Sequence, residues 1–347
     1  KPESYTDSTT KRYPLLLMFN GLGEVENNLS TINDYGPNRR ILDGPWRGAQ
    51  QLGDSTFEFI SCAFQIPSSG IVAPTVLVRI VDTILTRYRV DTTRVYAVGL
   101  SGGAQGFFRS TGITTLSNYK YIQWTAAVLW SSGTTMPGAV IDSIAQWTRK
   151  GGGLMYAIGN ADNAGNRIQA PVVLAAGNAG RPGSTVGYTW THPPWPDAGH
   201  GGWNYGYDSS YTDPSLGINI YQFLLGHSKR PYAGAGEDVI NTTETSVTLN
   251  GVSRQYPWGY NGNGTTTITW TKVSGPSATI NSPNSDTTDV NLTGGEVTYI
   301  FRLTSANAAG GLSATKDVTV IKQSSSLPPG VVGVKEKSKK WFIKKAD

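Results

Sequence analysis

Residues 99–103 read Gly-Leu-Ser-Gly-Gly, so Ser101 has the Gly-x-Ser-x-Gly spacing of a nucleophile elbow. In such an elbow a tight turn between a strand and a helix exposes the serine hydroxyl, and the glycines leave room for a strained backbone. The chain holds 42 glycines, so the spacing alone is a weak signal. The apolar run before it and the helix-like segment after it favour Ser101 as the nucleophile of an acyl transfer, with a plain glycine-rich turn as the alternative.

A serine hydroxyl reacts readily only when a base takes its proton and an acid orients that base. The chain has three histidines, and His192, His200 and His227 all follow Ser101. His227 ends a helix-like segment, where capping is the favoured role, and His192 is followed by two prolines. His200 lies in a glycine-rich loop before the last predicted helix, from which its ring can reach the elbow. We therefore predict His200 as the base, with His192 as the alternative.

The acid is expected in the loop that leaves the strand predicted at residues 154–158, because the partners follow the serine in the order acid, then histidine. Asp162 occupies that loop. The competing interpretation is an Asx-type turn residue, since the loop is rich in Asn and Asp. Asp142, within a helix-like segment, and Asp197, close to His200 in sequence, are weaker candidates.

A second group of glycines follows the first predicted strand, in the sequence Asn20-Gly21-Leu22-Gly23-Glu24. In this arrangement the loop after that strand supplies one oxyanion donor and the residue after the nucleophile supplies the other. We predict the backbone N–H groups of Leu22 and Gly102 as this pair. A plain tight turn is the alternative for the loop.

These residues require a sheet whose strands end at one edge. Continuous apolar runs predict strands, and apolar residues at helical spacing predict helices. Strand and helix alternate through residues 14–230, which predicts the α/β class with a mostly parallel sheet and helices on both faces. The predicted strands are 14–19, 57–64, 95–100, 124–130, 154–158 and 186–191, the helices are 74–90, 139–149 and 214–225, and a turn is expected at 91–94.

The pattern changes after Pro231-Tyr232, where short alternating strands are separated by Thr, Ser, Asn and Gly turns. Strands are predicted at 246–249, 267–270, 298–303 and 317–321, and together they fit a small all-β sandwich. Residues 323–334 have the composition of a linker. We therefore predict a catalytic domain at 1–230, a β-sandwich at 231–322, and a linker with a basic tail at 323–347.

Composition narrows the possible partners. Of the net charge of +5, the tail 335–347 contributes +4 from six lysines and two acids, so no nucleic-acid partner is expected. Cys62 is the only cysteine, which excludes an intrachain disulfide and disfavours a thiolate metal site. No cofactor or metal is expected. No apolar stretch is long enough for a membrane helix, so no membrane partner is expected either. The absence of an apolar leader suggests a removed signal peptide, and the terminal linker suggests a further segment beyond residue 347.

With these elements placed, residues 1–230 resemble secreted α/β-hydrolase esterases of the polyhydroxyalkanoate-depolymerase and feruloyl-esterase-like group. The resemblance rests on segments 13–24, 95–104, 159–162, 199–203 and 211–225, which occur in the family's order. It implies an α/β-hydrolase fold and a secreted serine carboxylesterase. One position departs from the family, which usually has a structural histidine where this chain has Asn20, although asparagine can also form hydrogen bonds.

Residues 231–322 resemble a PKD-type immunoglobulin-like domain. The segments that carry this resemblance are 231–237, 247–251, 270–276 and 299–304. Such domains are usual in secreted bacterial enzymes that act on polymers, where they serve as spacers or weak binding modules. The resemblance therefore implies an extracellular setting.

Trp195 and Trp203 lie close to His200 in the sequence, and Trp130 follows the predicted strand after the elbow, where pocket walls form in this fold. Aromatic faces beside the base suit a planar acyl group, a sugar ring or an apolar polymer, whereas the competing interpretation makes them core residues. The leading hypothesis is a serine carboxylesterase for polymeric esters, either feruloyl or acetyl polysaccharide esters or a polyester. A serine peptidase and a non-catalytic binding or adhesion protein on a hydrolase scaffold are the alternatives.

Overall fold

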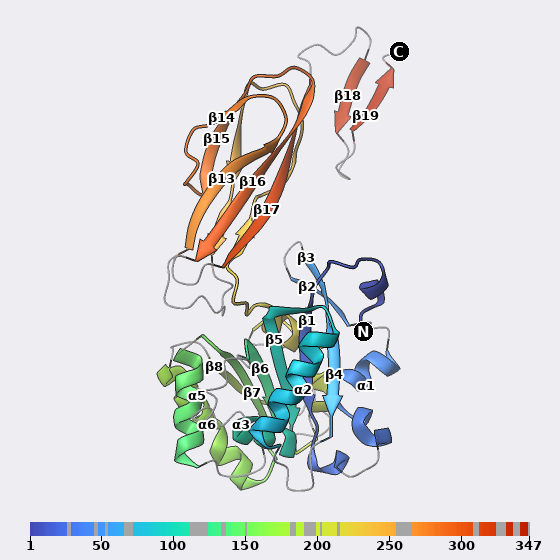
Figure 1. Ribbon diagram of the computed structural model, residues 1–347, viewed down its shortest axis with the longest axis vertical. Helices are drawn as coiled ribbons and strands as arrows, with labels where there is room; N and C mark the ends of the chain where they lie inside the picture. Colours follow the sequence, from blue (N-terminus) through green and yellow to red (C-terminus); the bar gives the residue numbers. More distant parts are fainter. Residues whose placement is uncertain are drawn as a thin grey trace. The chain divides into compact units, whose positions relative to one another are not determined.

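The chain divides into two compact units after Lys229 (Figure 1). The computed structural model describes residues 1–25, 29–44, 48–52, 55–65, 72–110, 124–132, 137–149, 151–180, 185–190, 199–201, 203–213, 216–254, 266–307, 312–323, 331–335 and 341–345. Within these residues, no helix is long and apolar enough to cross a membrane.

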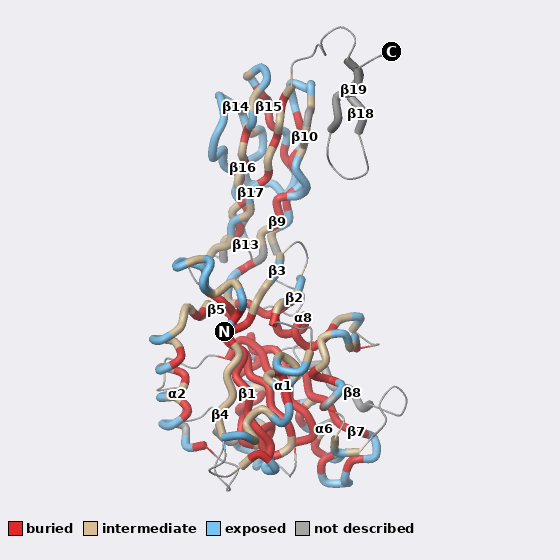
Figure 2. Tube along the Cα trace, turned by 90° about the vertical axis from the view of Figure 1, so that its right-hand side faces the viewer, coloured by how far each residue is buried: buried red, intermediate tan, exposed pale blue. Residues whose placement is uncertain are grey.

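A six-stranded sheet, parallel throughout, forms the centre of the first unit. Its strands, in spatial order, are β4 (Ile60–Phe64), β1 (Tyr13–Phe19), β5 (Val90–Leu100), β6 (Ala126–Trp130), β7 (Gly153–Gly159) and β8 (Thr185–Trp190). Every residue of β1 is buried, as Figure 2 shows along the strand. Continuous apolar runs therefore fill both faces of the sheet, because alternate side chains point to opposite sides.

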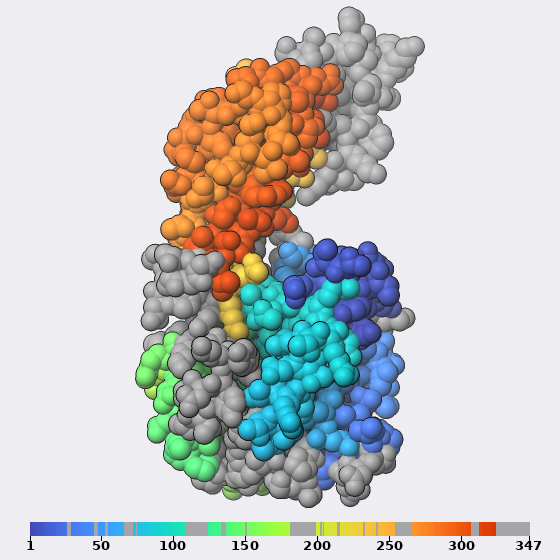
Figure 3. All heavy atoms as spheres, viewed as in Figure 1, coloured from blue at the N-terminus to red at the C-terminus, as the bar shows by residue number. Residues whose placement is uncertain are grey.

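Helices cover both faces of this sheet. On one face α2 (Pro74–Arg87), α3 (Gly102–Ser110), α5 (Gly138–Arg149) and α6 (Ala164–Gly180) pack around Leu15, Leu17 and Ala97. The α2 side chains form the cyan surface in Figure 3. On the other face α1 (Gly36–Asp43), α7 (Trp203–Gly206) and α8 (Ile220–Leu225) pack around Leu16, Met18 and Val98. This layered parallel sheet confirms the α/β prediction and is the arrangement of α/β-hydrolases.

Three predicted elements differ from the observed ones in more than their exact ends. The strand expected at 57–64 is broken at Phe59: β3 (Ser55–Glu58) pairs antiparallel with β2 (Ala49–Leu52), and only β4 joins the main sheet. The turn expected at 91–94 lies inside β5. Tyr13 pairs with Val90 but Leu15 pairs with Val95, so an irregularity in the pairing takes up the extra residues. The helix expected from residue 214 begins only at Ile220, because the Asn219 side chain caps it through the Gln222 N–H.

Apart from the one-turn helix α7 and the short 3-10 helices, two of the described helices were not expected from the sequence. Helix α6 contains Pro171 and is rich in Gly, Ala and Asn, so its helical period is weak. Helix α1 begins at Gly36, whose φ of +78° is a conformation that glycine adopts readily. Both helices flank the region in which the predicted catalytic residues lie.

The second unit is a β-sandwich, as predicted. One sheet has the order β10 (Val239–Thr242), β17 (Ser313–Lys322), β16 (Val297–Asn307), β13 (Thr266–Ser274), and the other β11 (Ser246–Asn250), β15 (Thr287–Leu292), β14 (Ala278–Ile280). Strand β9 (Tyr232–Gly234) pairs with β12 (Val252–Arg254). Buried Trp270, Tyr299 and Phe301 lie in the core between the sheets. Within the segment predicted as linker and basic tail, β18 (Val331–Lys335) and β19 (Trp341–Lys345) form an antiparallel hairpin.

Candidate active site

Ser101 sits at the turn between β5 and α3 with a φ of +49°, a conformation uncommon for residues other than glycine. Its N–H donates to the Trp130 carbonyl oxygen at 2.8 Å, which ties the turn to the neighbouring strand β6. A Cβ atom at Gly99 would lie only 3.0 Å from the Ala104 nitrogen. The glycine before the serine is therefore needed so that α3 can start directly behind the strand.

His200 lies between β8 and α7 and reaches the elbow serine. Its Nε2 atom is 2.8 Å from the Ser101 Oγ atom. The imidazole is 42% exposed, so one side of this contact is open to a ligand. The Trp203 ring meets the imidazole edge-on, with 4.9 Å between ring centroids, and supports its orientation.

Asp162 follows β7 and completes a chain of hydrogen bonds. His200 Nδ1 lies 3.1 Å from both carboxylate oxygens of Asp162, whose side chain is 1% exposed. The Asn163 N–H and the Asn166 Nδ2 atom donate to Asp162 Oδ1 at 2.7 and 3.0 Å. These donors compensate a buried carboxylate and hold its second oxygen toward the imidazole. The structure thus brings together the three residues predicted as the triad.

Asn166 was missed in the sequence. It lies one helical turn beyond Asp162, in the first turn of α6, and also approaches His200 Nδ1 at 3.4 Å. An Asn at the fourth position after a catalytic Asp is informative only once a helix is known to begin between them. Because the sequence does not predict α6, the spacing between Asp162 and Asn166 carries no signal by itself.

The loop Asn20–Glu24 packs against the elbow. A Cβ atom at Gly102 would lie 2.4 Å from Leu22 Cγ, so Leu22 and Gly102 are in direct contact. Leu22 opens the short 3-10 helix η2 (Leu22–Glu24) and Gly102 opens α3, positions whose N–H groups have no partner inside their own helix. Within the described segments, neither N–H meets a protein acceptor. Leu22 and Gly102, whose N–H groups meet no described acceptor, therefore contact each other next to the elbow, and their role as an oxyanion hole remains a prediction.

The buried side chains of Glu24 and Asn20 hold this loop in place through hydrogen bonds. Asn20 Nδ2 donates to Glu24 Oε1 at 2.8 Å and to the Ile32 carbonyl oxygen at 2.9 Å, and the Gly21 N–H donates to Glu24 Oε2 at 2.8 Å. Both side chains are buried. Asn20 therefore supports the loop at the position where the resembling family has a histidine. Burial raises the pKa of Glu24 from 4.5 to about 7, although these N–H donors oppose the shift.

The close packing at the start of α3 gives the first prediction. Replacing Gly103 by alanine is expected to lower the free energy of unfolding by about 3 kcal/mol, as overpacking does. The new Cβ atom would lie 2.1 Å from the Phe19 carbonyl oxygen and 2.4 Å from that of Asn20, and these backbone atoms cannot move aside cheaply. The clash outweighs the gain of about 1 kcal/mol that alanine has over glycine in a helix. Denaturant unfolding measures the effect.

Gly23→Ala is the matched control. Gly23 lies in the loop that packs against the elbow, yet nothing lies within 4 Å of a Cβ atom at that position. The variant is expected to change the free energy of unfolding by less than about 1 kcal/mol. Equal free energies of unfolding for the Gly103→Ala and Gly23→Ala variants would show that residues 19 and 20 do not pack closely against α3 in solution.

The three tryptophans predicted to bind substrate differ in where the structure places them. Trp203 contacts His200 and is largely buried. Trp130 has no exposed surface and lies beneath Gly206, where a Cβ atom would be 1.9 Å from its ring, so the substrate-binding role expected for it is wrong and it belongs to the core. Trp195 lies outside the described residues. Tyr35, which the sequence analysis did not single out, is 39% exposed and meets Trp203 edge-on at 6.5 Å.

Two of the alternative partners considered for Ser101 lie in described residues, and neither contacts it. His227 is buried at the end of α8, where its Nδ1 atom lies 2.9 Å from the Phe223 carbonyl oxygen, in keeping with a capping role. Asp142 is exposed on α5. His192 and Asp197 lie outside the described residues.

Comparison with known proteins supports the assignment of the second unit. Residues 235–321 match a family model that describes a PKD domain. The solution structure of the PKD domain from the KIAA 1837 protein is 27% identical over 28% of this chain and 92% of that chain, with a TM-score of 0.22. A PKD domain from human KIAA0319 is 20% identical over 28% of this chain and 87% of that chain, with a TM-score of 0.23.

For the first unit, the crystal structure of a thermostable esterase is similar over 63% of this chain and 55% of that chain, at 15% identity and a TM-score of 0.42. The matched part thus spans about half of that esterase. A search of the curated proteins finds no match.

Proposed function

We propose that this protein is a serine carboxylesterase in which Ser101 is the nucleophile. The observation that carries the proposal is the continuous hydrogen-bonded chain from Ser101 Oγ through both nitrogens of His200 to the buried Asp162 carboxylate. The strained backbone at Ser101 supports it, because such strain is concentrated at functional sites.

The geometry supports a two-step acyl transfer. His200 Nε2 takes the hydroxyl proton as Ser101 Oγ attacks the ester carbonyl, while Asp162 fixes the tautomer of His200 and stabilises the imidazolium. The N–H groups of Leu22 and Gly102 are the donors for the negative charge that develops on the carbonyl oxygen. His200 then protonates the leaving alcohol, and water hydrolyses the acyl-enzyme by the same route.

For the substrate we propose a bulky or polymeric ester, of the feruloyl or acetyl polysaccharide class or of the polyester class. Exposed Leu22 and Tyr35, with Trp203 between Tyr35 and His200, give the region around the nucleophile an apolar and aromatic character. Because the second unit matches a PKD family model, we propose that it acts as a spacer or weak polymer binder in a secreted enzyme.

Labelling with a fluorophosphonate probe tests the proposal directly. We expect stoichiometric attachment at Ser101, located by peptide mass spectrometry, together with faster cleavage of p-nitrophenyl and feruloyl esters than of fluorogenic peptides. Peptide cleavage that exceeds ester cleavage would instead identify a peptidase. A folded protein without any labelling would identify a non-catalytic binding protein.

A further inference from the structure

Glu24 is an acidic side chain, in the loop that packs against the elbow, that the proposed reaction does not use. It is 1% exposed, and its carboxylate accepts hydrogen bonds from the Asn20 side chain and the Gly21 N–H, both at 2.8 Å. The Glu24 N–H in turn donates to the Gly21 carbonyl oxygen at 3.1 Å. Residues 21 and 24 therefore close a reciprocal cap around Leu22.

The surroundings of Glu24, as far as the structure describes them, show no cation paired with its charge. Within the described residues, no lysine, arginine or histidine forms an ion pair with it. The titratable groups that face it are Asp34 and Tyr207, and the Asp34 charge adds to the effect of burial in raising its pKa. The Tyr35 N–H is a third donor to the carboxylate.

We propose that the Glu24 carboxylate is a positioning group of the oxyanion loop, which holds the Leu22 N–H toward Ser101 only while Glu24 is ionised. This inference rests on the proposed esterase function. An ionised carboxylate only accepts hydrogen bonds, so both of its oxygens suit the donors around it. A protonated carboxyl directs its own O–H at one of these donors. The contact with Asn20 or Gly21 is then lost, and the cap around Leu22 opens.

The direction of the pH effect on activity follows from the pKa of about 7. As the pH falls through 7, Glu24 takes up a proton and the loop loses its positioning group. His200 must also be free of a proton to act as the base. Two protonations therefore lower the rate, and the slope of log kcat/KM against pH should exceed 1 on the acidic side.

The effect of Glu24 on stability has the opposite sign. Its pKa in the folded state lies above the ordinary value of 4.5, so the folded state binds the proton more tightly than the unfolded state. The contribution of Glu24 to stability is therefore greatest below pH 4.5 and falls as the pH rises to about 7. The ionisation that positions the loop also makes the fold less stable.

The test uses the full chain between pH 5 and 9, in wild type and Glu24→Gln. It measures kcat and KM for p-nitrophenyl acetate hydrolysis and, separately, the midpoint of unfolding. Glutamine has a similar shape but presents an NH₂ group to the Asn20 NH₂ group. We expect kcat at pH 8 to fall by about 10- to 100-fold, somewhat less than on removal of an oxyanion donor. KM should stay within about threefold, because the oxyanion exists only in the transition state. The acidic slope should fall to 1.

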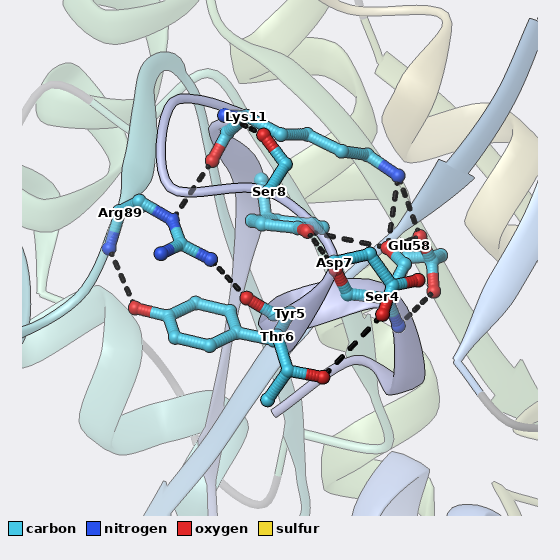
Figure 4. Close-up of polar contacts among 9 residues, drawn as sticks. Ser4, Tyr5, Thr6, Asp7, Ser8, Lys11, Glu58 and Arg89 are labelled. Carbon is cyan, nitrogen blue, oxygen red and sulfur yellow. Dashed lines mark hydrogen bonds and ion pairs between the residues drawn. The ribbon is translucent and has the colours of Figure 1, made fainter.

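Glu58→Gln is the matched control. Glu58 is a partly buried carboxylate at the opposite end of β1, where it accepts hydrogen bonds from Lys11 and Ser4 (Figure 4). The same chemical change at this position should leave kcat within about twofold and the acidic slope above 1, as in wild type.

Each result decides the inference. A wild-type acidic slope of 1 would overturn it even if Glu24→Gln failed to fold, and so would a folded Glu24→Gln enzyme whose kcat and slope match wild type. An unfolding midpoint that rises with pH in wild type relative to Glu24→Gln would contradict the assigned burial of the charge. A wild-type chain that neither hydrolyses the ester nor labels at Ser101 would overturn the proposed function, and this inference with it.

Discussion

Replacing Ser101 by alanine is expected to lower kcat for p-nitrophenyl acetate by about 10⁴- to 10⁶-fold, as the loss of a triad nucleophile does in other serine hydrolases. Alanine keeps the backbone turn but has no oxygen to attack the ester or to share a proton with His200. Residual turnover would come from the Leu22 and Gly102 donors and from water. Steady-state kinetics measures the loss, and fluorophosphonate labelling should disappear with it.

Ser131→Ala is the control for this substitution. Within the described residues, Ser101 and Ser131 are the two residues other than glycine with positive φ, at +49° and +48°. Ser131 follows the adjacent strand β6 and is buried, but it has no hydrogen bond to His200. The variant should therefore retain kcat within a few-fold. If Ser101→Ala retained more than about a tenth of the wild-type rate, the nucleophile would have to be another residue.

Replacing Asp162 by asparagine should cost about 10⁴-fold in kcat while leaving the fold intact. The Asn163 N–H and the Asn166 side chain donate to Oδ1 at 2.7 and 3.0 Å, so position 162 must keep an oxygen there. The new NH₂ group then faces His200 Nδ1. The imidazole is forced to accept at Nδ1 and to carry its proton on Nε2, where it cannot take the proton of Ser101.

The kinetic comparison uses Asp142→Asn, the same change at an exposed carboxylate on α5. Its kcat should match wild type within about twofold. A loss of less than tenfold for Asp162→Asn would contradict the proposed orienting role. So would an equal loss in both variants.

Short-range patterns in the chain were sufficient to predict much of this molecule. Five consecutive residues are enough to identify the elbow, because the tight turn at Ser101 requires small residues directly before and after the serine. The order of strand and helix patterns predicted that Asp162 and His200 follow strands that end at the same edge as Ser101. The alternation of short strands after residue 231 predicted the β-sandwich for a similar reason, since one buried face repeats every second residue.

Tertiary structure alone decided which side chains are buried, and at what distance from one another. Trp130 was placed at the substrate because it follows a strand, yet it is fully buried with its ring against Gly206 of α7. Asn166 can donate to Asp162 only because α6 places it one helical turn beyond that residue. The pKa of Glu24 is raised to about 7 because the folded loop buries its carboxylate. Burial and hydrogen bonding between distant segments depend on the sum of many weak packing contacts. No local spacing in the sequence encodes that sum.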